Sequence, residues 1–217
     1  MPEASPAGHY KEEKANALTH APGILMAIGG TPYLIKVAAA NGASGTQIFG
    51  IVLFGVSMLV LYLASTIYHS IHDPERKRMA RQFDHIAIYF LIAGTHTPFI
   101  LKYLDNPKGW VYLFILWGLA LIGTIGKLAA IGKWDRLSLV LYLFMGWMVV
   151  FVLPDIWPVM SGEVLAWIGT GEFFYTAGVF FYTRKKMPYA HALWHLFVLA
   201  GTAGHFVALW KAFGIPG

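Results

Sequence analysis

Long apolar segments separated by short connections dominate this chain of 217 residues. Each segment is close to the ~20 residues with which an α-helix crosses the hydrocarbon of a bilayer. Because the connections are short, neighbouring helices must run antiparallel. We therefore predict an all-α membrane protein, a single seven-transmembrane helix bundle. The predicted spans lie near residues 21–40, 47–70, 83–103, 110–130, 137–154, 164–183 and 190–213.

The composition supports a membrane protein and limits its chemistry. Hydrophobic residues make up 57% of the chain and charged residues 12%, against about 25% charged residues in soluble domains. We interpret the excess of Lys and Arg as a membrane feature and predict no nucleic-acid partner. The chain has no Cys, which excludes disulfides, thiolate metal sites and cysteine nucleophiles. Residues 1–20 are predicted to be a polar N-terminal segment without a cleavable signal peptide, and residues 21–217 the transmembrane domain.

The basic residues predict the orientation of the bundle. With seven spans and a cytoplasmic N-terminus, 12 Lys and Arg residues fall inside and 3 fall outside. This asymmetry favours a cytoplasmic N-terminus and a C-terminus outside, in a bacterial-type plasma (inner) membrane. The inside set is Lys11, Lys14, Arg76, Lys77, Arg78, Arg81, Lys127, Lys133, Arg136, Arg184, Lys185 and Lys186; the outside set is Lys102, Lys108 and Lys211.

Polar side chains from separate segments are predicted to meet at one membrane depth. His191 and His195 are four residues apart at the start of the last span, so they share one helix face. Ser65 and His69 have the same spacing at the inner end of the second span, and Asp84 stands at the inner start of the third. Ionisable groups inside a membrane are costly and usually functional.

Two interpretations of this polar layer remain open on the residues alone. Three histidines with an open coordination position are typical of a catalytic zinc site, where a carboxylate such as Asp84 holds and deprotonates an activated water. A serine hydroxyl such as Ser65 would hydrogen-bond that water or the substrate. Alternatively, Asp84 caps the start of the third helix and the histidines anchor at headgroup level.

The same residues resemble the progestin and adipoQ receptor superfamily, and specifically its bacterial hemolysin III-like branch. The resemblance implies a zinc ion (Zn²⁺) held by His69, His191 and His195, with Asp84 and Ser65 next to it. His96 departs from the expected tyrosine but affects no ligand. The resembling segments are EEKANALTH (Glu12–His20), STIYHSIH (Ser65–His72), FDHIAIYFLIAGTHTPF (Phe83–Phe99) and GVFFYTRKKMPYAHALWHLFVLAGTAGHF (Gly178–Phe206).

The remaining histidines and charged residues of the spans are predicted to lie outside the set of metal ligands. His20 is expected either beside the cluster or, preferably, as a helix-start residue, while His72 is placed in the basic loop and His85 in a structural role. Four residues lie too far along their helices to share the inner metal. They either line a polar cavity above the site or are satisfied individually between helices: Lys36, His96, Glu172 and His205.

Three functions compete. The first is a zinc-dependent intramembrane hydrolase acting on a lipid amide such as a ceramide, the activity that the resemblance suggests, with a membrane lipid as partner. The second is a receptor or sensor in which the zinc is structural. The third is a pore-forming hemolysin-like protein. The sequence argues against it, because no amphipathic helix that could line a pore stands out. A retinal protein is set aside, because Lys211 lies at the outer end of the last span.

Overall fold

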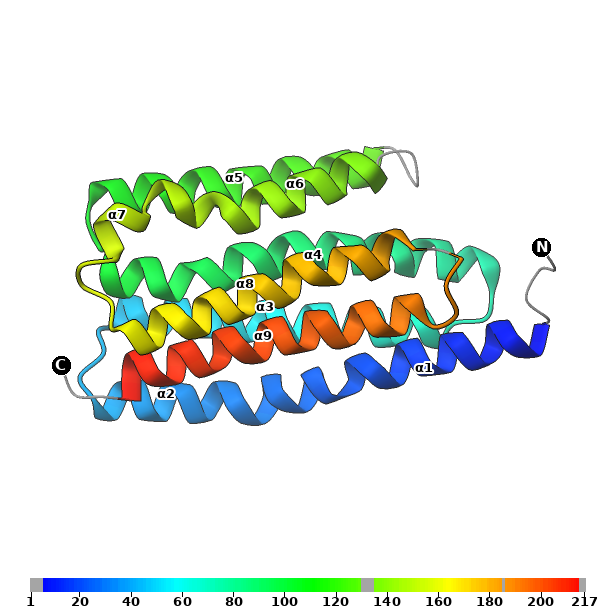
Figure 1. Cartoon of the computed structure of the whole chain (residues 1–217), viewed down its shortest axis with the longest axis horizontal. Coiled ribbons are helices and arrows are strands. Elements are labelled where there is room, and N and C mark those ends of the chain that lie inside the picture. Colours follow the sequence, from blue (N-terminus) through cyan, green and yellow to red (C-terminus); the bar gives the residue numbers. More distant parts are fainter. Residues whose placement is uncertain (1–5, 130–134, 185, 215–217) are drawn as a thin grey trace.

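The structure, a computed structural model, describes residues 6–129, 135–184 and 186–214, and all regular structure within these ranges is helical. The helices run side by side as an elongated bundle (Figure 1). In chain order the elements are α1 (Pro6–Leu25), η1 (Met26–Gly30), α2 (Thr31–Ala40), α3 (Gly45–Ser70), α4 (Pro74–Tyr103), α5 (Pro107–Ala129), α6 (Asp135–Trp147), η2 (Met148–Phe151), α7 (Leu153–Ile156), α8 (Gly162–Thr183) and α9 (Ala190–Gly214). The basic residues Lys133 and Lys185 lie outside the described ranges.

Six of the described helices are long and apolar enough to cross a membrane, so the chain is a multi-pass membrane protein. The predicted span at 137–154 is helical but interrupted, because α6 tightens into the 3₁₀ turn η2 before Pro154 begins the short α7. A proline can start a helical turn but cannot continue one from the preceding residues. The α6–η2–α7 segment lies alongside α5 (Figure 1), and a seventh crossing there stays a prediction.

The N-terminal segment is helical from Pro6, and α1, η1 and α2 form one rod that includes the candidate span Tyr10–Ala40. The run of Ala, Lys and Glu in Lys11–Ala17 has high helix propensity, so the helix extends through polar sequence on the N-terminal side of the predicted first span. The π-helical turn η1 follows Pro22. His20 therefore lies well inside α1, and its preferred interpretation as a helix-start residue is wrong.

Helix α4 begins earlier than the predicted third span. Asp73 caps its first turn by accepting a hydrogen bond from Arg76 N at 2.9 Å, and Pro74 occupies the first helical position, where its missing N–H costs nothing. The basic residues 76–81 thus lie on the first turns of α4. Asp84 stands inside the helix, so the interpretation of Asp84 as a helix cap is wrong.

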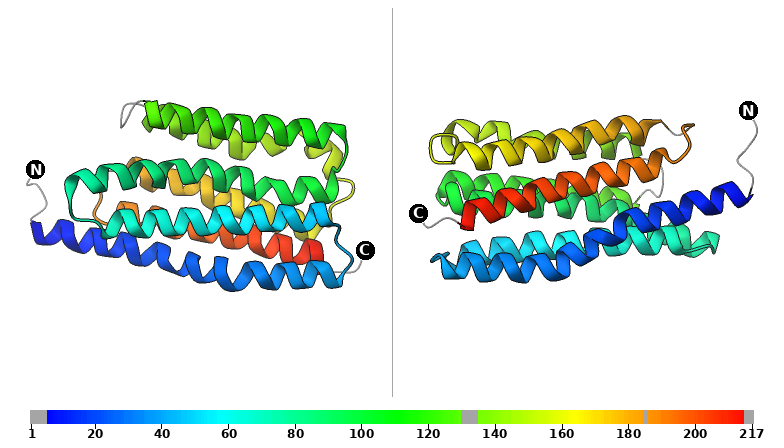
Figure 2. Two further views of the ribbon diagram at one scale, coloured as in Figure 1. Left: turned by 180° about the vertical axis from the view of Figure 1, so that it is seen from behind. Right: turned by 60° about the horizontal axis from the view of Figure 1, so that its bottom comes forward.

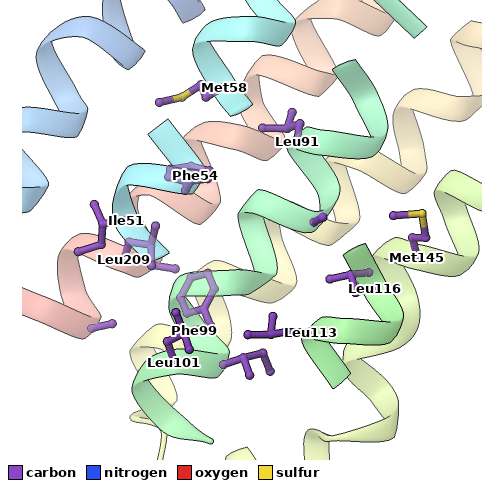
Figure 3. Packing of buried hydrophobic residues seen from close by; sticks show 14 of the residues in the cluster. Ile51, Phe54, Met58, Leu91, Phe99, Leu101, Leu113, Leu116, Met145 and Leu209 are labelled. Atoms are coloured by element: carbon purple, nitrogen blue, oxygen red, sulfur yellow. The ribbon is translucent and has the colours of Figure 1, made fainter. Parts of the chain in front are cut away.

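The apolar core fills the space between the helices along the bundle. Figure 3 shows Phe54 and Met58 of α3 facing Leu91 and Phe99 of α4, while Leu209 approaches from α9. The most extensive helix pairs are α3 with α4 and α8 with α9. Helix α1 begins at one end of the bundle and α9 finishes at the other (Figures 1 and 2). The first turn of α9 lies at the end where α1 begins, where the last turns of α3 also lie.

Candidate metal centre

Three histidines from two helices meet at this end of the bundle. His69 comes from the last turn of α3, and His191 and His195 come from the first turns of α9. Each offers a ring nitrogen, and these three atoms lie within 4.8 Å of one another. His69 and His195 are buried, and His191 is half-buried. The predicted convergence of these three side chains is confirmed, because the i, i+4 spacing places both histidines of α9 on one face.

Hydrogen bonds to α1 fix which nitrogen of two of these rings points into the cluster. His195 Nδ1 donates to the backbone carbonyl of Asn16 at 3.0 Å, and His69 Nδ1 donates to Glu13 Oε2 at 3.1 Å. A neutral imidazole that donates from Nδ1 presents an unprotonated Nε2. The lone pairs of both Nε2 atoms are thus available as ligands, and a carboxylate behind a ligand histidine raises its basicity.

The cluster has the donor chemistry that a metal requires. His69 Nε2 and His191 Nε2 are 3.2 Å apart, close to the separation of about 3.3 Å expected for two ligands on a tetrahedral zinc. His195 Nε2 is buried without a hydrogen-bond partner among the described residues. A buried nitrogen without a partner is costly, and lone pairs facing one another repel. A cation between the three rings would remove both penalties.

Apart from His20, the residues that α1 contributes to the cluster were not predicted. Besides Glu13 and Asn16, Thr19 Oγ1 lies 3.2 Å from His195 Nδ1. His20 stacks on His195 with ring centroids 3.5 Å apart, and both its ring nitrogens lack a described partner. The signal was present in EEKANALTH, where Glu13, Asn16 and His20 are spaced three and four residues apart and so share one helix face.

Ser65 lies one turn before His69 on α3 and Asp84 lies on the neighbouring α4, and neither belongs to the three converging nitrogens. Their part in the site stays a prediction. Both side chains are buried, and the Asp84 carboxylate faces Ser65 and His69. Ser65 Oγ forms no hydrogen bond of ordinary length and angle with any described residue. This arrangement leaves a hydroxyl and a carboxylate free to contact a further group next to His69.

One cavity reaches the cluster at His191, and a second ends beside it at His20. The first has about 920 Å³ of empty space, part of it open to the surroundings, and is lined by polar groups including Glu12, Arg81 and His191. The other has about 790 Å³ of empty space and runs between α4, α6, α8 and α9. Its walls are mainly apolar, His20 and Trp194 line it near the cluster, and it also opens at one side.

The other polar residues occupy varied places. His72 lies in the α3–α4 connection, as predicted, and His85 contacts Lys127 Nζ at 3.1 Å. His96 and Glu172 line the apolar cavity, and His205 lies 3.4 Å from Glu172. His96 and Glu172 therefore border a cavity, but its walls are mainly apolar and not polar as predicted. The cavity prediction is wrong for Lys36, whose exposed side chain lies on the outer face of α2.

The chain is similar to known proteins over most of its length. A family described as "Haemolysin-III related" matches residues 8–206. The chain is 43% identical over 196 residues to "Hemolysin-3 homolog" of Bacillus subtilis (strain 168), covering 90% of this chain and 92% of that one. It is 39% identical over 196 residues to "Hemolysin-3" of Bacillus cereus, covering 90% and 89%. It is 29% identical over 214 residues to the human "Monocyte to macrophage differentiation factor", covering 94% and 87%.

Proposed function

This chain belongs to the haemolysin-III related family, and from that premise we propose that it is a zinc-dependent intramembrane hydrolase acting on a lipid amide. The observation that carries the proposal is the convergence of three histidine nitrogens, two of them with a tautomer fixed by hydrogen bonds from α1. We take the metal to be zinc, because three histidines with an open position are the ligand set of a catalytic zinc site.

The proposed orientation has the cluster at the cytoplasmic face of a plasma membrane. We take α6–η2–α7 as the seventh crossing, which puts the N-terminus inside and the C-terminus outside. The support is the placement of Lys77 and Arg81 on α4 at the cluster end of the bundle, together with the excess of Lys and Arg in the same set of connections.

The roles of the protein side chains follow from their positions. His69, His191 and His195 would hold the zinc, which when bound supplies Lewis-acid activation of a carbonyl and of water. Asp84, which faces His69, takes up a proton at its carboxylate during attack and returns it to the departing amine. Ser65 Oγ, which has no hydrogen-bond partner among the described residues, would donate a hydrogen bond to the substrate.

The apolar cavity supports a lipid substrate. It extends from His20, which stacks on the ligand His195, through apolar walls that include Leu91 and Leu143. The acyl chain of a lipid bound there would exchange contact with bilayer hydrocarbon for contact with apolar side chains, while the amide of that lipid would reach the histidine cluster. The polar cavity beside His191 and Arg81 provides a separate route for water and for a polar product.

Metal analysis and lipid hydrolysis test the proposal together. Purified wild-type protein should contain about one zinc per chain, and His191→Ala should lose it, while His72→Ala in the α3–α4 connection should retain it. Asp84→Asn should retain zinc but release no fatty acid from a ceramide. Wild-type protein that carries no metal after purification without chelators would end this proposal.

A structural zinc in a receptor or sensor is the second candidate. It is favoured by one observation, that the ligands come from α3 and α9 while the groups behind them come from α1. A metal there would hold three helices together. In that case His191→Ala lowers thermal stability, and zinc-loaded wild type leaves ceramide and other lipid amides unchanged.

A further inference from the structure

A third cavity opens between α6 and α8 at the end of the bundle that holds the histidine cluster. It has about 1430 Å³ of empty space, part of it open to the surroundings. Its walls come from the start of α6, the end of α8 and the connection between α8 and α9. These segments lie at the same end as the first turn of α9 (Figure 1). The polar cavity beside His191 is its neighbour, and the two share Tyr182 and Met187.

Three cationic side chains border this cavity. Arg136 is the second residue of α6, Arg184 directly follows α8, and Lys186 stands in the connection to α9. All three are exposed, and none of them forms an ion pair with a carboxylate of the described residues. Like charges gathered around one space repel one another, so an anion held between them would be stabilised.

The carboxylate that also lines this cavity does not cancel that charge. Asp135 accepts from Lys127 Nζ at 2.8 Å through one oxygen and from Arg81 Nη2 through the other. Its negative charge is therefore already compensated by two cations. Residues 130–134 and 185, which lie outside the described ranges, contain no Asp or Glu. The cavity thus carries an excess of positive charge.

The cations lie at the depth of lipid headgroups. Arg184 is the first residue after the candidate membrane span Gly162–Thr183, and Lys186 follows two residues later. Arg184 Cζ lies 4.7 Å from the centroid of the Phe180 ring, and Phe180 is exposed on the outside of α8. A guanidinium that covers an exposed aromatic ring of a span keeps its charge at the membrane surface.

An apolar groove continues from the cationic end. Leu139 of α6 lines both this cavity and the apolar cavity that runs deeper between α6 and α8, where Leu143 and Val179 form part of the wall. Helices α6 and α8 touch each other at few points, so an acyl chain can lie between them. One continuous space therefore offers cations at the membrane surface and apolar side chains below them.

A topology signal alone does not account for this arrangement. The preference for Lys and Arg on one face of a membrane places them in the connections on that face. It does not bring residues from two separate segments around one cavity, and it does not join that cavity to an apolar groove. Basic pockets between transmembrane helices are typical binding sites for anionic lipid headgroups.

We propose that this cavity binds an anionic phospholipid of the surrounding membrane. The phosphate group lies between Arg136, Arg184 and Lys186, and an acyl chain passes Leu139 into the groove between α6 and α8. The cations recognise the charge of the headgroup, and the groove selects a lipid over a soluble anion. This site depends neither on a bound metal nor on hydrolysis.

Thermal unfolding of the full-length protein in a neutral detergent tests this site. The Tm is measured with increasing dioctanoyl-phosphatidylglycerol, dioctanoyl-phosphatidylcholine or inorganic phosphate at constant ionic strength, since a ligand of the folded state raises the Tm. Phosphatidylglycerol should raise the Tm at concentrations at which the other two do not. An equal rise with phosphatidylcholine would mean that the charge is not recognised. An equal rise with phosphate would mean that no acyl chain is bound, and either result would overturn the proposal.

Charge-removing variants locate the binding. Arg136→Gln/Arg184→Gln removes two exposed cations of the cavity and should raise the apparent dissociation constant for phosphatidylglycerol about fivefold for each charge removed. Arg76→Gln/Arg78→Gln is the matched control, because it removes the same charge from exposed residues of α4 that do not line the cavity. It should bind like wild type. If the first variant does not fold, Lys186→Gln measures the loss of a single charge. Equal dissociation constants for the cavity variants and the control would rule out this site.

Discussion

Glu13 Oε2 of α1 lies 3.1 Å from His69 Nδ1 of α3, and Lys77 Nζ of α4 lies 2.6 Å from the same carboxylate oxygen. Glu13 thereby orients the candidate ligand His69, and the Lys77 ammonium holds Glu13 in place. The polar first helix is consequently part of the candidate metal centre, although its sequence predicted only a polar N-terminal segment.

Glu13→Gln is expected to weaken metal binding while the fold is retained. Loss of a carboxylate behind a ligand histidine typically lowers metal affinity about 10- to 100-fold, because a glutamine oxygen can still accept from His69 Nδ1 but carries no charge to raise the basicity of the ring. Competition of purified protein against a zinc-chelating dye measures the change. The control is Glu12→Gln, because the one hydrogen bond of Glu12 to a described residue is from Tyr189 N at 3.3 Å, and a glutamine oxygen can still accept there. Equal affinities for the two variants would remove Glu13 from the centre.

Asp84→Asn and Ser65→Ala are expected to separate chemistry from metal binding. Neither side chain belongs to the three converging nitrogens, so both variants should contain as much zinc as wild type. Loss of a proton-transferring carboxylate typically costs about 10²- to 10⁴-fold in rate, whereas Ser65→Ala removes one hydrogen bond and should cost less. Fatty-acid release per bound zinc measures both. Loss of zinc in Asp84→Asn would instead make Asp84 a ligand.

Gly23→Ala is expected to destabilise the protein beside the cluster. A Cβ at Gly23 would lie 2.4 Å from the ring of Tyr62, so α1 and α3 would have to separate, at a cost of about 1–3 kcal/mol. Gly118→Ala on α5 is the matched control, since its Cβ meets nothing within 4 Å and alanine favours a helix. Thermal unfolding in detergent should show a lower Tm for Gly23→Ala and an equal or higher one for Gly118→Ala.

Asp135 is expected to stabilise the protein at neutral pH. His85, Lys127 and Arg81 hold the pKa of the Asp135 carboxyl well below its usual range. A carboxyl with a lowered folded-state pKa stabilises the fold above its unfolded-state pKa of about 3.9, and this contribution is lost as pH falls through the folded-state value. Asp135→Asn should therefore lower the Tm at pH 7, and the difference from wild type should shrink below about pH 4. A difference that is constant from pH 7 to pH 3 would contradict this linkage.

Much of the architecture was predictable because a membrane limits what the backbone can do. Unpaired N–H and C=O groups are too costly in hydrocarbon, so apolar segments of this length become helices. The predicted spans at 47–70 and 190–213 agree with α3 and α9 within two residues. The errors fell where polar sequence continues a helix beyond the apolar segment, as in α1 and at the start of α4. Hydropathy indicates which residues cross the membrane, whereas helix propensity and capping residues determine where the helix begins and ends.

The sequence by itself determined that His191 and His195 share a helix face and that His69 stands at the same depth, because helical periodicity and alternating direction are local properties. Only the tertiary structure decided that α1 lies against these residues and supplies Glu13 and Asn16 to orient them. Which helices touch depends on packing, such as the close approach of Gly23 to Tyr62. Tertiary packing likewise brought Glu172 against His205, since residues on separate helices meet only when their faces are turned toward each other.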